Sequence, residues 1–158
     1  MDAGEWAVLA AVVFTGLWSG LLAMLTLVMH PMLARMSGSE FARFIDAFIP
    51  VARVAPINYA AVAGMVISPV VALIAIDTSE TAFVLTAAGL ALTIAGPLLV
   101  SNRLAEPNYD AMLAWNPDSL PQDWESVKAR YLRLNWIRAF ATWIAWGLFL
   151  AALVDLLR

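Results

Sequence analysis

The sequence predicts an all-α integral membrane protein, a four-helix bundle with one additional amphipathic helix, and three observations lead to this fold class. Hydrophobic residues make up 63% of the 158 residues and charged residues only 13%, whereas soluble domains carry about 25% charge. Residues 6–29, 54–76, 81–102 and 139–154 contain no charged side chain. The cationic residues, finally, gather on one side of the predicted membrane.

The four uncharged stretches are long enough to cross a bilayer, since a spanning helix needs about 20 apolar residues. We therefore expect spans at about 6–29, 54–76, 81–102 and 136–156, in a single domain that covers residues 1–158. The last span reaches this length because Arg138 and Arg158 lie near its ends. Their long side chains can extend to the membrane interfaces.

The positions of Lys and Arg predict the orientation of the spans. All of these residues except Arg158 fall in the two segments that join span one to span two and span three to span four. Cytoplasmic loops carry the excess of cations. We therefore expect a multi-pass protein of the cell's inner (plasma) membrane with both termini on the non-cytoplasmic side.

The two predicted cytoplasmic segments differ in character. In the first, Ser37 and Glu40 fit a capping box, which predicts a helix over about 38–49 that ends at Pro50. Its apolar residues recur at helical spacing, which is typical of an amphipathic interfacial helix; a short connector packed on the bundle fits equally well. The second segment, about 101–123, is rich in proline and predicts a structured loop, after which a helix from about Pro121 runs into span four.

Composition excludes several classes of function. The chain has no Cys and one His, so disulfides, thiolate nucleophiles and multi-His metal sites within one chain are excluded. Nine Lys and Arg residues give no basic face for nucleic acid. His30, Glu106 and Asp110 lack any diagnostic metal-ligand spacing. We therefore predict no metal and no cofactor.

Polar residues gather at the cytoplasmic ends of the predicted spans, where they would surround one vestibule. Such groups are costly near a membrane and are often functional. The candidates are His30, Asn58, Tyr59, Asn102, Arg130, Asn135 and Arg138. Arg138 is the sharpest of them, because an arginine here needs an oxygen partner and no acidic residue lies within its next helical turn. Pairing across helices and ligand contact are both open.

Two further groups extend this candidate site. Thr142 continues the helical face of Asn135 and Arg138 into the membrane. Trp18, Trp143 and Trp146 lie deep in the spans, away from the interfaces where Trp is usual. They could line an aromatic pocket, although ordinary packing explains them as well.

The sequence also resembles a known family. The residues on which this resemblance rests are Ser101-Asn102-Arg103-Leu104, Asn108, Ala114-Trp115, Trp124, Arg130 and Leu134-Asn135-Trp136-Ile137-Arg138, with Pro31 to Arg35 after the first span. This pattern resembles the anthrone-oxygenase-like family of small four-helix membrane proteins, most of which have no known function. The chain departs from the family at Trp136, where a histidine is frequent.

The resemblance implies oxygenation of a flat polycyclic phenol or anthrone to a quinone, without metal or flavin. A base would remove a C–H proton and the resulting enolate would react with oxygen. His30 is then the candidate base, and Asn102, Asn135 and Arg138 are the candidate oxyanion donors. The candidate substrate contacts are Trp18, Asn58, Tyr59, Trp115, Arg130, Thr142, Trp143 and Trp146.

A non-catalytic role is the main alternative to an oxygenase. The same vestibule would then bind a lipid, a quinone or a partner subunit. A small transporter is disfavoured, because the chain has four spans and no acidic residue in mid-membrane. The expected partners are membrane lipids and an apolar aromatic or lipid-like molecule, and a homo-oligomer is left open.

Overall fold

The computed structural model describes all residues, 1–158, and nearly the whole chain is helical. In chain order the elements are α1 (Ala3–Ala23), the π-helix η1 (Met24–Met29), α2 (His30–Arg35), α3 (Gly38–Val54), α4 (Pro56–Ala75), α5 (Thr81–Thr93), the π-helix η2 (Ile94–Ala105), α6 (Glu106–Leu113) and α7 (Trp124–Leu156).

These elements form four long rods. Helices α1, η1 and α2 are continuous over Ala3–Arg35, and α5, η2 and α6 are continuous over Thr81–Leu113; α4 and α7 are the other two. Each rod is long and apolar enough to cross a membrane. This confirms the predicted all-α fold class with four spanning helices.

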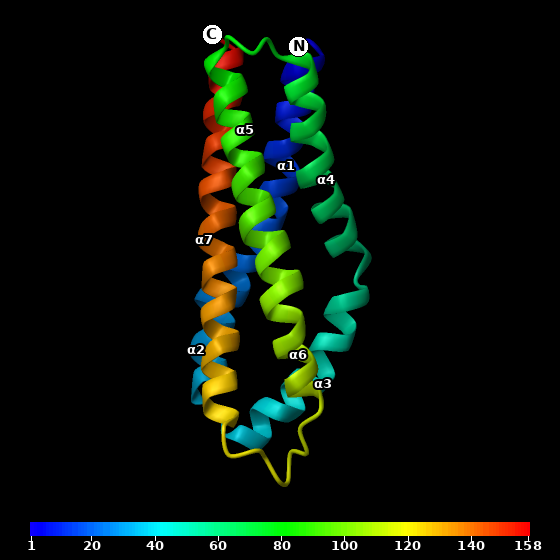
Figure 1. Cartoon of the computed structure of the whole chain (residues 1–158), viewed down its shortest axis with the longest axis vertical. Coiled ribbons are helices and arrows are strands. Elements are labelled where there is room, and N and C mark those ends of the chain that lie inside the picture. Colours follow the sequence, from blue (N-terminus) through cyan, green and yellow to red (C-terminus); the bar gives the residue numbers. More distant parts are fainter.

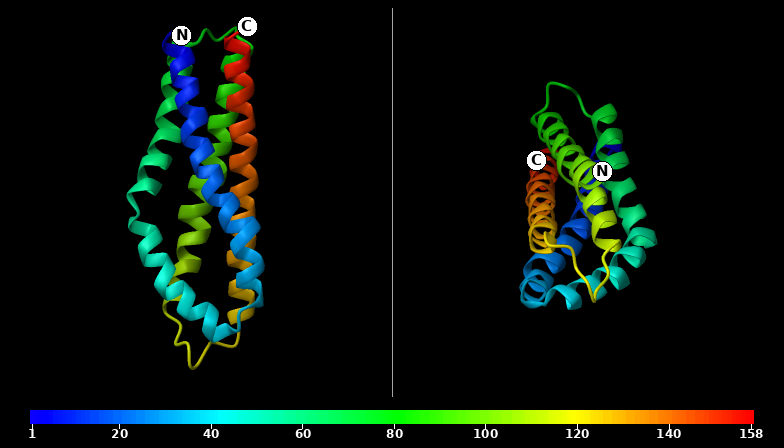
Figure 2. Two further views of the ribbon diagram at one scale, coloured as in Figure 1. Left: turned by 180° about the vertical axis from the view of Figure 1, so that it is seen from behind. Right: turned by 60° about the horizontal axis from the view of Figure 1, so that its bottom comes forward.

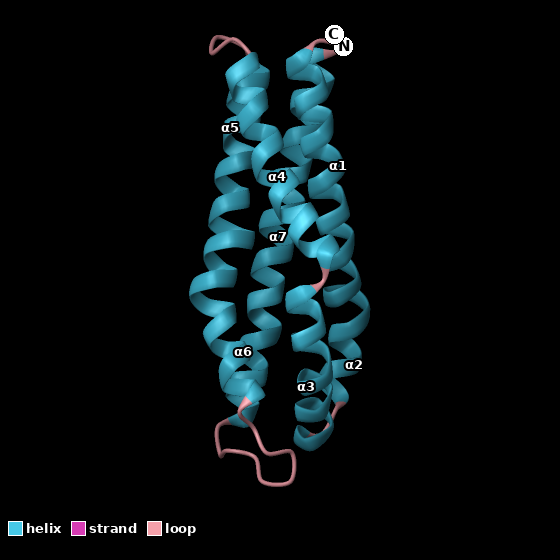
Figure 3. Ribbon diagram, turned by 90° about the vertical axis from the view of Figure 1, so that its right-hand side faces the viewer, coloured by secondary structure: helices cyan, strands magenta, loops and turns pink.

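The rods pack as an antiparallel ring in which α1 contacts α4 and α7, and α5 contacts α4 and α7. Figures 1 and 2 show both termini and the turn between α4 and α5 at one end, which we call the termini end. Helix α3 and the connection from α6 to α7 lie at the other, the loop end (Figure 3). Helix α4 packs on α5 but has little contact with η2. The ring is therefore less tightly closed toward the loop end.

Small residues close the termini half of the bundle, and aromatic residues fill the loop half. Buried alanines, such as Ala11, Ala72 and Ala145, let the helices approach closely near the termini. Near the loops, Tyr131 of α7 is fully enclosed and packs edge-on against Phe41 of α3.

Helix α3 corrects the expected helix end at Pro50, because it continues through that residue to Val54. Proline leaves the carbonyl one turn earlier without its helical donor. Here Pro50 is on the exposed side of α3, so water can satisfy that carbonyl. Helix α3 rises obliquely from the loop end to the start of α4, from which a break at Ala55 separates it (Figure 1).

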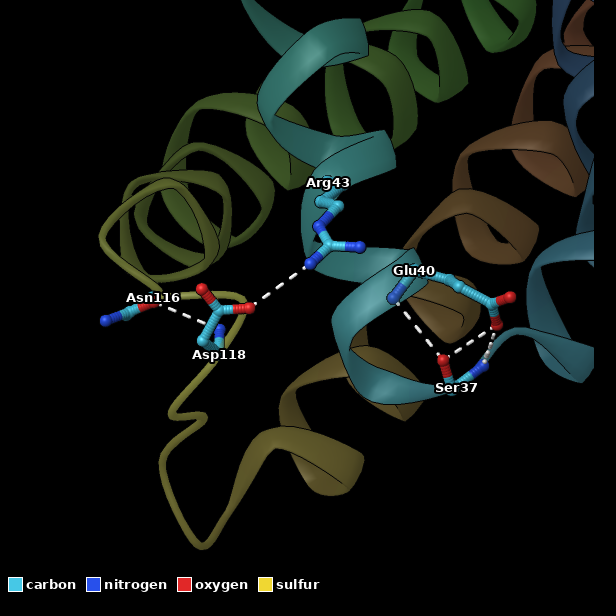
Figure 4. Close-up of polar contacts among 5 residues, drawn as sticks. All are labelled: Ser37, Glu40, Arg43, Asn116 and Asp118. Carbon is cyan, nitrogen blue, oxygen red and sulfur yellow. Dashed lines mark hydrogen bonds and ion pairs between the residues drawn. The ribbon is translucent and has the colours of Figure 1, made fainter.

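Three contacts attach α3 and its neighbours to the loop end. Arg43 pairs with Asp118 of the α6–α7 connection at 3.2 Å (Figure 4). The Lys128 ammonium donates hydrogen bonds to the carbonyls of Ala34, at 3.4 Å, and Met36, at 2.8 Å. Lys128 thus satisfies carbonyl groups at the end of α2, where the helix itself offers no donor.

The predicted loop over 101–123 is mostly helical, which is a second correction. Residues up to Leu113 belong to η2 and α6, and only 114–123 form an irregular connection. Pro107 is the second residue of α6, and because η2 continues directly into α6, its missing amide hydrogen leaves one η2 carbonyl without a helical donor. The helix expected to run into span four begins at Trp124, close to the predicted position.

The capping box at the start of α3 makes this helix end sensitive to acid. The Ser37 hydroxyl and amide donate to the Glu40 carboxylate at 2.7 and 2.8 Å (Figure 4), and these bonds lower the pKa of Glu40. Because the pKa of Glu40 is lowered in the folded chain, these bonds contribute fully to folding stability above the ordinary Glu pKa of about 4.3. This contribution is lost as the pH falls through the pKa of Glu40 in the folded chain.

We expect the Ser37→Ala variant to titrate Glu40 at a higher pH than the unaltered chain. The substitution removes one donor to the carboxylate and leaves the backbone donor in place. Carboxyl-carbon NMR of Glu40 measures both midpoints directly. Equal midpoints in the two proteins would contradict the capping box.

Candidate binding cavity

A cavity of about 1030 Å³ opens in the loop half of the bundle. Its walls come from α1 and η1, the α3–α4 junction, η2 with α6, and α7. Pockets for small molecules commonly measure roughly 300–1,000 Å³. Most lining residues are apolar, among them Trp18, Leu22, Leu25, Phe48, Val62, Pro97 and Leu98. The space therefore suits an apolar ligand of substantial size.

Arg138 supplies the uncompensated charge of this cavity. It lies on α7, lines the cavity and is only 9% exposed. It forms no ion pair with any carboxylate. One terminal nitrogen, Nη1, donates to the Tyr109 hydroxyl at 2.8 Å and to Asn135 Oδ1 at 3.2 Å. A buried charge that meets only neutral partners favours an added anionic or strongly polar oxygen.

The remaining guanidinium nitrogens of Arg138 have unused donor capacity. Nε is enclosed and has no hydrogen-bond partner. Nη2 makes no hydrogen bond and is not among the enclosed atoms, so it reaches the accessible side of the cavity wall. An arginine fork of this kind holds oxygen acceptors in fixed geometry.

Hydrogen bonding around Asn135 determines how His30 is oriented. Because Asn135 Oδ1 accepts from Arg138, its Nδ2 donates to His30 Nε2, at 3.3 Å. His30 therefore carries its ring proton on Nδ1, which is buried and has no partner. His30 is 5% exposed and is not part of the cavity wall. His30 thus contacts Asn135 on the side away from the cavity and holds its amide in place, and Asn135 in turn orients Arg138.

Two tyrosines complete the polar part of the wall. Tyr109 of α6 accepts the hydrogen bond from Arg138, which leaves its hydroxyl proton free to donate. Tyr131 of α7 also lines the cavity, and its hydroxyl has no partner. With Arg138, the two tyrosine hydroxyls thus give the wall donors that no protein group uses.

Arg53, the other arginine of the cavity, is neutralised. Its Nη2 lies 2.6 Å from Glu106 and 2.7 Å from Asp110, and the guanidinium also lies 5.9 Å from the centre of the Tyr109 ring. The hydrogen bond that Arg53 donates to Asp110 and the charge of Glu106 raise the pKa of Arg53. The two carboxylates exceed the one guanidinium by a single negative charge, but neither forms an ion pair with Arg138.

The structure brings together part of the predicted site. Trp18, Asn58, Tyr59, Asn102 and Arg138 all line the cavity. Asn58 also closes the α3–α4 junction, since its Nδ2 donates to the carbonyl of Ala52 at 2.7 Å.

Other predicted residues have structural contacts away from the cavity. Thr142 donates to the Arg138 carbonyl, and Trp143 Nε1 donates to the carbonyl of Ser19 at 3.3 Å. Trp146 packs over Gly16, and Trp115 packs against Phe41. Arg130 is exposed on α7. The reading of Trp143 and Trp146 as ordinary packing fits these contacts.

Sequence reasoning missed Tyr109, Tyr131 and Glu106. A signal for Tyr131 was present, because it precedes Arg138 by two helical turns and so shares its face. For Tyr109 and Glu106 there was none, because residues 101–123 were expected to form a loop and no helical face could be assigned to them.

Comparisons with family models, with curated proteins and with solved structures found no significant match to this chain.

Proposed function

We propose that this protein is a membrane module that binds an apolar small molecule through an electron-rich oxygen. The observation that carries the proposal is Arg138, a buried arginine without a carboxylate partner in the wall of a largely apolar cavity. An apolar ligand body would fill the space, and its phenolate, quinone or carboxylate oxygen would meet Arg138.

A flat fluorescent phenol, 1,8-dihydroxyanthraquinone, tests this proposal. We expect saturable binding of one dye per chain to the protein in phosphatidylcholine nanodiscs, with quenching of Trp18, which lines the cavity. Trp18→Phe should remove much of the quenching while the dye's own fluorescence still reports binding. Trp146→Phe is the matched control and should retain the quenching, because Trp146 is outside the cavity wall. Absence of saturable binding by either signal would overturn the proposal.

Oxygenation is the second candidate, and the donors of the wall favour it. An oxyanion that forms on the substrate would be stabilised by Arg138 Nη2 and the Tyr109 hydroxyl. In the balanced reaction, an anthrone methylene and one O₂ give the quinone carbonyl and one water. Because His30 is behind Asn135, its access to the substrate proton is indirect. Oxygen uptake with 1,8-dihydroxyanthrone separates the two candidates, since the binding module consumes none above an empty nanodisc.

We also propose that the loop end faces the cytoplasm of the cell's inner membrane. Every Lys and Arg except Arg158 lies in a segment at the loop end or in the adjoining part of a helix, and cytoplasmic segments carry the excess of cations. Because the chain has no Cys, a single cysteine introduced at Asp118 or at Ser79 is the only thiol in the protein. Its labelling by a membrane-impermeant maleimide therefore reports on which side of the membrane that position lies. Labelling of the Asp118 site from outside intact cells would reverse the orientation.

A further inference from the structure

The cavity is polar at one end and apolar at the other. Along α4, Asn58 comes before Val62 and Ala63, so the amide lies nearer the loop end. Along η2, which runs in the opposite direction, Pro97 and Leu98 come before Ser101 and Asn102. Arg53 at the end of α3 and Glu106 and Tyr109 in α6 are nearer still to the loop end along the chain. The part toward the termini end is lined by apolar residues alone, including Trp18 and Val62.

The polar part falls at the level of a membrane interface. Helix α4 has 20 residues, which at 1.5 Å per residue spans about 30 Å, the thickness of the hydrocarbon layer. Its start at Pro56 therefore marks the loop-side boundary of the hydrocarbon. Arg138 lies about 27 Å from the end of α7 at Leu156 by the same rise, close to that boundary. The apolar part of the cavity is then at the depth of the lipid chains.

The cavity also has an apolar rim that faces outward. Val51, Ile57 and Tyr59 line it and are nevertheless 68%, 51% and 64% exposed. Leu21 of α1 and Met24 of η1 likewise line the cavity and are exposed. Toward the loop end, by contrast, Arg53 joins α3 to α6 through Glu106 and Asp110. The side of the cavity is apolar and open, whereas the end toward water is bridged by ion pairs.

From these three features we propose that the natural ligand is an amphiphile of the membrane leaflet at the loop end. Its acidic oxygen head lies at Arg138 and Tyr109, its apolar tail lies along Trp18 and Val62, and it enters from the lipid through the open rim at Ile57. This deepens, and rests on, the proposed binding function. A single long-chain acid has the required chemistry, with one negative charge for the one unpaired arginine.

Two photoreactive fatty acids test the orientation of the ligand in nanodiscs. One carries a diazirine beside the carboxylate and the other carries it in the middle of the chain. We expect peptide mapping to place the first label on α6 and α7, near Tyr109, and the second on α1 and α4, near Trp18 and Val62. An identical pattern for both acids, or the reversed pattern, would overturn the amphiphile inference.

Substitutions at the rim test the path of entry. Ile57→Trp places a bulky group at the rim, and Ile67→Trp places the same group on the exposed lipid side of α4, away from the cavity. We expect Ile57→Trp to reduce labelling by the long acids severalfold, because the bulky group obstructs the open rim. Ile67→Trp should leave this labelling unchanged, and circular dichroism checks that both variants fold.

The outcomes separate this inference from the proposed function. If the dye binds and the acids label the cavity without a preferred orientation, or if Ile57→Trp leaves their labelling intact, the amphiphile inference fails alone. If neither the dye nor the acids reach the cavity, the binding function itself fails, and this inference fails with it.

Discussion

Replacing Arg138 by alanine is expected to weaken binding of 1,8-dihydroxyanthraquinone by roughly tenfold to a hundredfold, which corresponds to the 1.5–3 kcal/mol of a hydrogen bond to a charged group. Arg138 is the unpaired cation of the cavity, and its Nη2 has no protein partner. Arg138→Lys should recover only part of the affinity, because an ammonium keeps the charge but loses the planar fork that also holds Tyr109 and Asn135.

Arg133→Ala is the matched control for this experiment. Arg133 is on the same helix, is exposed and forms no ion pair. Dye titrations of the three variants in nanodiscs, together with thermal unfolding, separate lost binding from lost stability. Full affinity in folded Arg138→Ala would show that the arginine serves only the bundle.

A methyl group at Gly96 is expected to give a large loss of stability for a single added carbon. A Cβ built there lies 2.3 Å from the Cβ of Ala141 on α7, which has no flexible side chain that could move away. Helices η2 and α7 would have to separate, and overpacking of this kind costs about 1–3 kcal/mol. Denaturation of Gly96→Ala in mixed micelles, followed by circular dichroism, measures this loss.

Gly147→Ala provides the comparison, since a Cβ at this position of α7 meets nothing within 4 Å. This variant should unfold like the unaltered chain or be slightly more stable, because alanine favours a helix over glycine. If both glycine variants unfold alike, the close approach of η2 and α7 is absent in the membrane.

The four spans could be predicted from the sequence because the hydrophobic effect acts on whole segments. In lipid, a long uncharged segment satisfies its backbone hydrogen-bonding groups mainly by forming a helix. The structure confirms four such helices. Their ends were less predictable. The sequence stretch 101–113 looked like a loop because of Pro107 and its polar residues, yet the helix continues through Pro107.

The candidate site was predictable only where a helical face could be assigned. Arg138, Asn135 and His30 were grouped by their places at helix ends, and the structure joins them by hydrogen bonds. The pairing of Arg53 with Glu106 and Asp110 joins residues more than fifty positions apart, and no periodicity reports such a contact. Which tryptophan faces the cavity likewise depends on how the helices rotate against one another, which composition does not determine.

The π-helical turns of η2 have a consequence for how this site can change in evolution. A π-turn accommodates one residue more than an α-turn, so it behaves as an insertion that the helix has absorbed. Deleting one residue within Ile94–Ala105 is then taken up by converting a π-turn to an α-turn, which leaves the residues after it in phase. Glu106 and Tyr109 would keep their places beside Arg53 and Arg138. The same deletion in α5 would instead rotate everything after it by about 100° about the helix axis and break both contacts. The length of this rod can therefore vary at η2 without loss of the site.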